Sequence, residues 1–164
     1  MNETAAGSAR VETKAPADVV VRGKASGFLQ TVESGSHRFQ VDEPINLGGT
    51  DLAPGPYEYL LAALGSCTSM TISLYARRKN WPLDEVTVSL RHSRIHARDC
   101  EECETKVGLL DHIEVEVSLS GELSREQHSK LMEIAGKCPV HRTLKSEIAI
   151  DLREVKETEF QPNE

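Results

Sequence analysis

One stretch constrains this chain more than any other: residues 57–80, which predict a single long helix. Pro54-Gly55-Pro56 precedes the stretch and Pro82 follows it, and proline is tolerated at the start of a helix but not inside one. Between them, side chains that can be buried recur at steps of three and four residues, which defines one face. At 1.5 Å per residue the helix is about 35 Å long. The positions on the face are Tyr57, Leu60, Leu61, Leu64, Thr68, Thr71, Ile72 and Tyr75.

The rest of the 164-residue chain predicts short strands around this helix. Glycine turns separate three β-prone runs before it, which favours an antiparallel meander. A second helix is expected at 125–137, where Ser124 and Gln127 form a capping box. The succession of three strands, a helix, two strands, a helix and a last strand predicts an α+β fold. The expected strands are 18–24, 28–34, 37–41, 86–96, 113–119 and 147–152.

Composition limits the domain organisation and the compartment. Residues 1–17 are polar and predict a disordered tail, 18–154 predict one domain, and 155–164 predict a loose tail. The N-terminus lacks the basic start and apolar stretch of a signal peptide, so we expect a cytoplasmic protein with reduced thiols. Aromatic residues make up 4 % of the chain, so the core is aliphatic and would gain stability from a second copy.

The charge balance excludes some partners. The chain has 26 acidic and 19 basic residues, a net charge of -7. Nucleic-acid binding needs a basic surface, so we expect no nucleic-acid partner. No apolar run approaches the roughly 18 residues of a membrane helix, so we expect no membrane partner either.

Cys138 directly precedes a proline in the segment CPVHRTL, which predicts the start of a short helix. A thiol at the N-cap is close to free N–H groups and to the positive end of the helix dipole, which stabilise a thiolate. Lys137, His141 and Arg142 add nearby positive charge. The sequence therefore predicts a lowered pKa for Cys138. The alternative is a small helix cap with an incidental sulfur.

Cys67 lies near the middle of the long predicted helix, about 60° from the centre of its apolar face. At the edge of the buried face a thiol can be reached and still be shielded. Gly65 and Ser66 beside it remove bulk and allow another element to approach. The alternative is core packing, because free cysteine is among the most buried residue types.

Together, GPYEYLLAALGSCTSMTISLYARRKNWPL and IAGKCPVHRTL resemble the OsmC-like family, which includes the organic hydroperoxide resistance enzymes. The DEPINLGGTD loop and the HSRIHARDCEECE segment are also similar to one branch of it. The resemblance runs from residue 18 to 153. Its specific part is a cysteine in the mid-chain helix combined with a Cys-Pro about 70 residues later.

The resemblance implies an intertwined homodimer, in which two long helices pack at the centre and antiparallel sheets wrap around them. It also implies a peroxidase that reduces hydroperoxides, organic ones preferentially, without a metal or organic cofactor. Cys67 would attack the O–O bond and become a sulfenic acid, and Cys138 would condense with it to a disulfide. A dithiol reductant would then reset the pair.

In the family's enzymes an arginine from an early strand and a glutamate near the start of the long helix hold the reactive thiolate. The resemblance points to Arg22 and Glu58, with Lys24 and Arg38 as other basic candidates. Arg22 is preferred because a guanidinium stays charged and has a fixed fork of donors; the alternative is a surface basic residue. Glu58 lies one place later than the family's acid. It is also nine residues before Cys67, about 180° around a straight helix. A solvated first-turn glutamate is the alternative.

Cys100 and Cys103 form a C-x-x-C motif among acidic residues. Nearby negative charge raises the pKa of a thiol, so this pair is expected to be a poor nucleophile. Three interpretations stay open. The pair is inert, or it binds a metal together with His92 and His96, or it is an accessory redox pair.

Two other functions compete with the peroxidase. The first is a non-catalytic dimeric binding module that holds a hydrophobic ligand or a metal between subunits. The second is a thiol–disulfide exchanger or redox sensor without peroxidase turnover.

Overall fold

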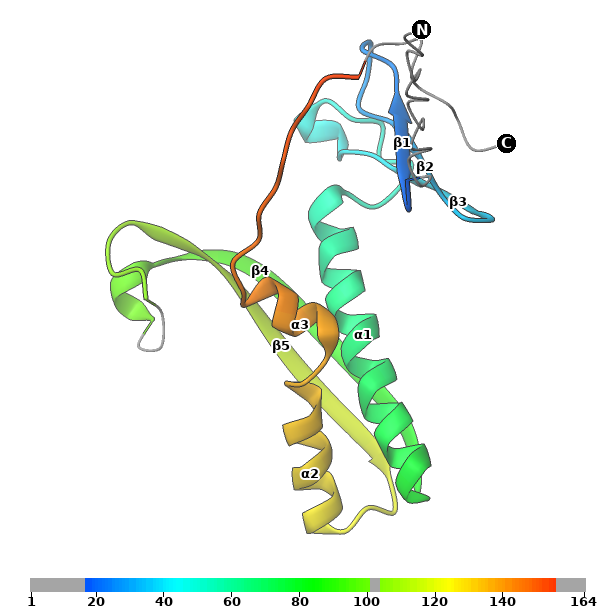
Figure 1. Ribbon diagram of the computed structural model, residues 1–164, viewed down its shortest axis with the longest axis vertical. Helices are drawn as coiled ribbons and strands as arrows, with labels where there is room; N and C mark the ends of the chain where they lie inside the picture. Colours follow the sequence, from blue (N-terminus) through cyan, green and yellow to red (C-terminus); the bar gives the residue numbers. More distant parts are fainter. Residues whose placement is uncertain (1–16, 101–103, 156–164) are drawn as a thin grey trace, which may run out of the picture.

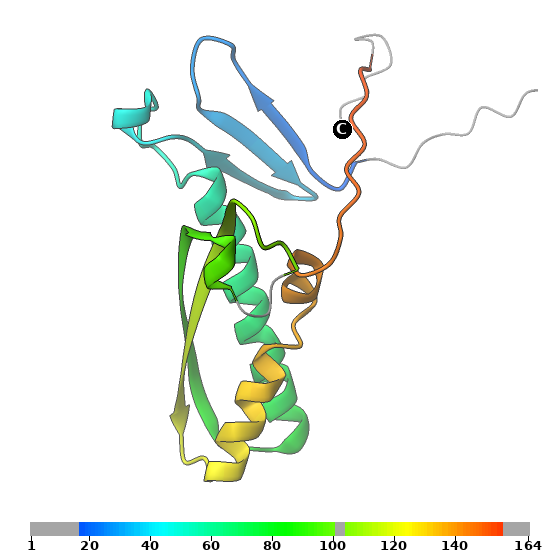
Figure 2. The same ribbon diagram turned by 90° about the vertical axis from the view of Figure 1, so that its left-hand side faces the viewer.

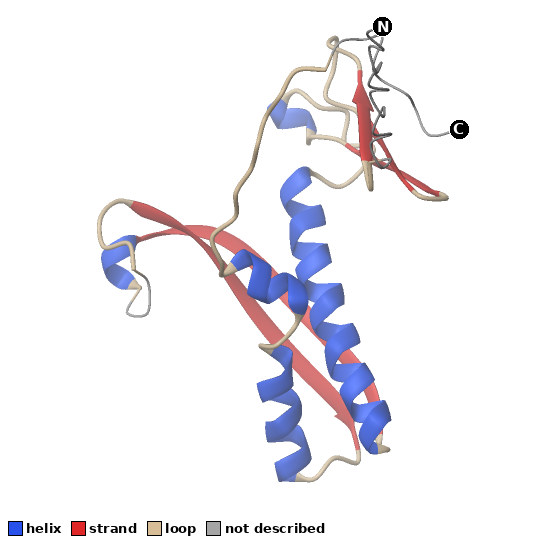
Figure 3. Ribbon diagram, viewed as in Figure 1, coloured by secondary structure: helices blue, strands red, loops and turns tan. Residues whose placement is uncertain are grey.

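The computed structural model describes residues 17–100 and 104–155, so both predicted tails lie almost wholly outside the described residues. The fold is α+β, as the order of segments predicts, with short 3₁₀ helices η1 and η2 in two connections (Figure 3). The elements in chain order are β1 (Val20–Gly23), β2 (Gln30–Ser34), β3 (His37–Val41), η1 (Ile45–Leu47), α1 (Pro56–Lys79), β4 (Leu83–His96), η2 (Ala97–Asp99), β5 (Leu109–Gly121), α2 (Arg125–Ala135) and α3 (Pro139–Leu144).

The larger part of the molecule, which we call the body, consists of α1, β4, β5, α2 and α3. β4 and β5 form a long antiparallel hairpin, and α1 and α2 cover one of its faces (Figures 1 and 2). The side chains of Ile72 on α1 and Leu131 on α2 are completely buried between these layers. Around them pack Tyr75, Trp81, Leu83, Val86, Val117, Leu119 and Leu123. The body therefore has one small, mostly aliphatic core.

Local signals fix both ends of α1, which confirms the predicted long helix. At its start, Glu58 Oε2 accepts a hydrogen bond from the Gly55 N–H at 2.7 Å. This contact satisfies one of the backbone donors that have no partner within the helix. At its end, Asn80 adopts a left-handed conformation, and the last turn is basic, which suits the negative end of the dipole.

Gly65 allows β4 to approach α1 closely, as the sequence predicts. A Cβ atom at this position would lie 2.6 Å from Leu90 Cδ1, closer than two carbon atoms can pack. Any larger residue would require the Leu90 side chain to move. This contact holds α1 close to β4 just before Cys67.

β1, β2 and β3 form a separate antiparallel sheet in the order β1-β2-β3, which confirms the predicted meander. It lies beyond the N-terminal end of α1, away from the hairpin (Figure 1). Two contacts link it to the helix: the Tyr59 ring lies 5.2 Å from that of Phe39, and the Tyr59 hydroxyl donates to Gln40 O at 2.6 Å.

Asp42 organises the loop between this sheet and α1. Its buried Oδ2 accepts hydrogen bonds from Thr50 N (3.0 Å), Thr50 Oγ1 (2.5 Å) and Leu52 N (3.2 Å). The bond from the Thr50 hydroxyl, helped by backbone N–H donors and opposed by burial, lowers the pKa of Asp42 to about 2. Oδ1 is buried and has no hydrogen-bond partner within the described part of the chain.

The last predicted strand, 147–152, is wrong: no strand forms there. Residues 145–155, which we call the C-terminal strap, leave α3 through a turn at 145–146 and then run without helix or strand toward the N-terminal sheet (Figures 1 and 2). Ile150 and Leu152 are 86 % and 99 % exposed. Apolar and polar residues do alternate in this segment, but a strand also needs a neighbouring strand to form hydrogen bonds with. Within the described residues of one chain, no strand pairs with the strap.

By length and composition, α1 is also able to cross a membrane, contrary to the sequence expectation. Its most apolar 18-residue window has a mean hydropathy of 1.3. A core helix passes the same test, and α1 packs against β4, α2 and α3. We therefore describe α1 as the central helix of the body.

Candidate active site

Cys138 is the N-cap of α3, as the sequence predicts. Its backbone is extended, and its Sγ accepts a hydrogen bond from the His141 N–H at 3.2 Å. The proline that follows it occupies the first position of the helix, where the missing N–H costs nothing. The start of α3 thus turns a backbone donor toward the sulfur.

The fold brings the two predicted redox cysteines together. α3 packs against the middle of α1, and the side chain of Cys67 lies close enough to Cys138 to help lower the pKa of its thiol. Both are free thiols in this structure. Cys138 is fully buried, whereas Cys67 is partly exposed. Of the two cysteines, Cys67 is the one with surface exposed to solvent in this chain.

Thr68 adds a hydroxyl to the pair. Its Oγ1 lies 3.5 Å from Cys138 Sγ and 2.9 Å from Leu64 O, and the residue is almost completely buried. The sequence places Thr68 on the buried face of the helix but does not predict it at the site. The signal was present, because a hydroxyl on an apolar face needs a partner.

The hydrogen bonds around Cys138 favour its thiolate. Burial, the largest single influence, raises the pKa of this thiol because it disfavours charge. Hydrogen bonds from the Thr68 hydroxyl, from the His141 N–H, from Cys67 and from the Val140 N–H together outweigh burial, so the pKa of Cys138 is lowered. The predicted direction is confirmed. The pKa is lowered by hydrogen bonds from the start of α3 and from α1, whereas the sequence also predicts an effect of nearby positive charge.

Arg22 lies on the sheet and forms an ion pair with Glu33 on β2. Its neighbour Val21 lines the cleft that faces α1, and successive side chains of a strand point to opposite faces. Arg22 therefore lies on the face turned away from α1 of its own chain. Lys24 lines the same outer hollow as Arg22, and Arg38 alternates with the cleft residue Phe39.

Glu58 is engaged at the start of α1, in the capping contact with Gly55. It precedes Cys67 by nine residues, a rise of about 13 Å along the helix. Within one chain its carboxylate serves the helix N-terminus rather than the thiol pair.

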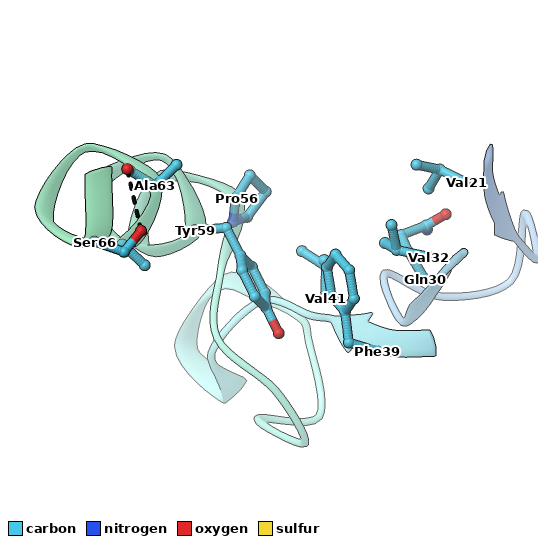
Figure 4. Close-up of a pocket in the computed structure, with 10 residues that line it drawn as sticks. Val21, Gln30, Val32, Phe39, Val41, Pro56, Tyr59, Ala63 and Ser66 are labelled. Carbon is cyan, nitrogen blue, oxygen red and sulfur yellow. Dashed lines mark hydrogen bonds between the residues drawn. The ribbon is translucent and has the colours of Figure 1, made fainter. Parts of the chain in front are cut away.

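An apolar cleft of about 670 Å³ separates the N-terminal sheet from the first half of α1 (Figure 4). In the close-up, Tyr59 lies beside Phe39 and Val41, and the open space separates the helix residues from Val21, Gln30 and Val32. The Ser66 hydroxyl donates to Ala63 O at 3.2 Å. The cleft ends at Ser66, the residue before Cys67. Its lining consists of Val21, Gln30, Val32, Phe39, Val41, Pro56, Tyr59, Ala62, Ala63 and Ser66.

His92 has partners other than a metal. Its ring stacks on Tyr57 with centroids 4.6 Å apart, and Nε2 lies 3.0 Å from Asp111 Oδ1. In residues 17–100 and 104–155, no three metal-ligating side chains lie close enough to hold an ion. Cys100 is disulfide-bonded. Cys103 lies outside the described residues, so the expectations for the C-x-x-C motif stay predictions.

The structure is that of an α+β protein with a pair of neighbouring free thiols. The model of the OsmC-like protein family matches residues 49–153, more than half of the chain, and the chain belongs to this family. No curated protein matches the sequence significantly.

Solved structures share the fold at low sequence identity. The OsmC-like protein of Mycoplasma pneumoniae is 20 % identical, with a TM-score of 0.61, over 81 % of this chain and 89 % of that one. The organic hydroperoxide resistance protein OsmC of Legionella pneumophila is 19 % identical, with a TM-score of 0.56, over 80 % and 92 %. The organic hydroperoxide resistance protein of Bacillus subtilis is 20 % identical, with a TM-score of 0.52, over 77 % and 88 %.

Proposed function

We propose that this protein is a thiol-dependent peroxidase that reduces hydroperoxides, organic ones preferentially. The observation that carries the proposal is the pair of neighbouring free thiols, Cys67 and Cys138, contributed by two elements of one chain. Membership of the OsmC-like family supports it, as do the names of the solved structures that share the fold.

The two cysteines differ in their exposure to solvent, and this difference supports separate roles. Cys67 is accessible, so its thiolate attacks one oxygen of the hydroperoxide, the O–O bond breaks, and the alkoxide leaves and takes a proton to become an alcohol. The buried Cys138 thiolate then attacks the sulfur of the Cys67 sulfenic acid. The S–O bond breaks, a disulfide forms, and hydroxide takes up a proton to become water.

A dithiol reductant completes the cycle. One of its thiolates attacks the Cys67–Cys138 disulfide to give a mixed disulfide, and its second thiol releases the protein dithiol. The two electrons that reduce the hydroperoxide thus come from the reductant. The cycle uses no metal or organic cofactor, and a cytoplasmic location would supply such a reductant.

The proposal includes the intertwined homodimer of the family. Apolar side chains of the strap and of α1 are exposed in the single chain, and the N-terminal sheet has open edges among the described residues. A second copy would bury both. It would also bring Arg22 and Glu58 of the second copy to the thiol pair. In the family's enzymes, an arginine and a glutamate hold the reactive thiolate.

The test is rapid mixing of the pre-reduced protein with cumene hydroperoxide. We expect the parent to form alcohol and lose two thiols, whereas Cys67→Ser falls to the buffer background. Cys138→Ser should be oxidised once and retain a sulfenic acid that a dimedone-type reagent traps. Cys100→Ser is the matched cysteine control and should keep the parent rate. An unchanged rate in Cys67→Ser would refute the assignment.

The apolar cleft favours a second candidate, a dimeric binding module for a hydrophobic ligand whose thiols rarely turn over. A cavity of about 670 Å³ is within the size range of small-molecule sites. A count of free thiols after peroxide treatment separates the two candidates. Rapid loss of two thiols per chain supports the peroxidase, whereas retained thiols together with binding of an apolar fluorescent probe support the binding module.

A further inference from the structure

The Thr68 hydroxyl faces two acceptors but has one hydrogen. Leu64 O lies 2.9 Å and Cys138 Sγ 3.5 Å from Oγ1. A threonine hydroxyl donates one hydrogen bond and accepts others through its lone pairs, so it cannot donate to both at full strength. Which acceptor receives the hydrogen therefore depends on whether the sulfur of Cys138 is protonated.

The two protonation states of Cys138 call for different arrangements. When the thiol is protonated, Thr68 donates to Leu64 O, and the Cys138 S–H donates to Thr68 Oγ1. When the thiol is ionised, the sulfur has only acceptor capacity, and the hydroxyl turns to it. Leu64 O then keeps its regular hydrogen bond within α1, so no buried carbonyl loses its last partner.

We propose that Thr68 is a positioning residue that turns its hydroxyl from Leu64 to Cys138 when this thiol ionises. It thereby stabilises the thiolate that resolves oxidised Cys67. The hydroxyl rotates and keeps its own hydrogen, and the proton of Cys138 is released to solvent. The role in turnover rests on the proposed function, whereas the hydrogen bond itself does not.

The other groups near the sulfur leave this role to Thr68. The N–H of His141 is fixed by α3 and cannot follow the charge on the sulfur. Cys67 is the titratable group that faces Cys138 from α1. Among nearby charged side chains, Arg142 and Lys137 are exposed, and Lys137 pairs with Glu133. Thr68 is the buried donor on α1 that is free to rotate.

The test is a titration of Cys138 as the sole cysteine, with Cys67, Cys100 and Cys103 replaced by serine. Serine at position 67 keeps a donor beside the sulfur. The ultraviolet absorbance of the thiolate is followed as pH rises. In Thr68→Val the midpoint should rise by roughly one pH unit, because a bond to a charged acceptor is lost. In Thr68→Ser, which restores the hydroxyl, it should stay close to the parent.

Thr71→Val is the matched control. Thr71 Oγ1 donates to Cys67 O at 2.7 Å on the same helix, the same kind of backbone contact as that of Thr68 with Leu64, but without a sulfur. Its removal should leave the Cys138 midpoint unchanged. The proposal is overturned if folded Thr68→Val titrates like the parent, or if Thr68→Ser shifts as much as Thr68→Val. Should Thr68→Val not fold, Thr68→Ala carries the same comparison.

A second measurement connects the residue to turnover. In the protein with all cysteines present, Thr68→Val should slow disulfide formation about tenfold at neutral pH and leave oxidation of Cys67 at the parent rate. If the parent does not reduce hydroperoxides, the proposed function fails, and the titration still decides the role of Thr68. If the parent turns over and Thr68→Val forms its disulfide at the parent rate, the role of Thr68 in resolution fails alone.

Discussion

The body and the N-terminal sheet differ in how far one chain completes them. In the body, α1, α2 and the β4–β5 hairpin enclose a core in which Ile72 and Leu131 have no exposed surface. In the sheet, Val32 is the buried apolar residue, and the face toward α1 opens into a cleft. The body therefore encloses a core of its own within one chain, although part of α1 stays exposed, whereas the sheet leaves its face toward α1 open.

The difference separates two parts of the site. The thiol pair, with Thr68 and the start of α3, belongs to the body and is assembled within one chain. Arg22 belongs to the sheet and faces away from α1. The two thiols thus meet within one chain, whereas any support from Arg22 would have to come from a second copy.

The sharpest way to test the comparison is to open the core of the body. Ile72→Ala should lower the free energy of unfolding by about 3 kcal/mol, because it leaves a cavity in a close-packed site. Chemical denaturation with a two-state fit measures this loss.

Leu74→Ala on the same helix is the matched comparison, since Leu74 is 43 % exposed in one chain. Its cost should stay below about 1 kcal/mol if the single chain is the stable unit. A loss as large as that of Ile72→Ala would show that a second copy covers this face of α1.

The strap tests the unfinished region. Ile148, Ile150 and Leu152 alternate along it. If the proposed dimer buries them, Ile150→Lys should prevent this burial and shift the protein toward the monomer in light scattering. Asp151→Lys changes charge on the opposite face of the segment and should leave the dimer intact. An unchanged dimer in Ile150→Lys would show that the strap is not part of the contact.

Glu58 should give the smallest effect. Glu58→Gln keeps an acceptor for the Gly55 N–H and removes only the favourable charge at the helix start, so stability should fall by about 0.5 kcal/mol or less. Thermal unfolding measures it. A large loss of hydroperoxide reduction at unchanged stability would instead show that this carboxylate reaches a reactive thiol, from a second copy.

Features encoded locally were predictable from the sequence. Proline and glycine mark the ends of α1, Ser124 and Gln127 cap α2 as predicted, and the proline after Cys138 fixes the N-cap of α3. Each depends on backbone groups within a few residues. The pairing of Cys67 with Cys138 came from a resemblance, because no local rule brings residues 71 positions apart into contact.

Features that depend on distant partners were not predictable. The alternation in the strap predicts a strand, but strand formation requires a pairing edge that the pattern does not identify. The face on which Arg22 lies follows from strand register, which residue type does not specify. Thr68 fits an apolar face by spacing, and only the position of α3 reveals that a sulfur lies opposite its hydroxyl.

The N-cap position of Cys138 has a consequence for α3 itself. The sulfur that accepts the His141 N–H holds the first turn of a six-residue helix. A disulfide sulfur is neutral and accepts a hydrogen bond more weakly than a thiolate. Oxidation would therefore loosen the helix from which the strap departs. The order of the chain near the C-terminus would then depend on whether the thiol pair is reduced or oxidised.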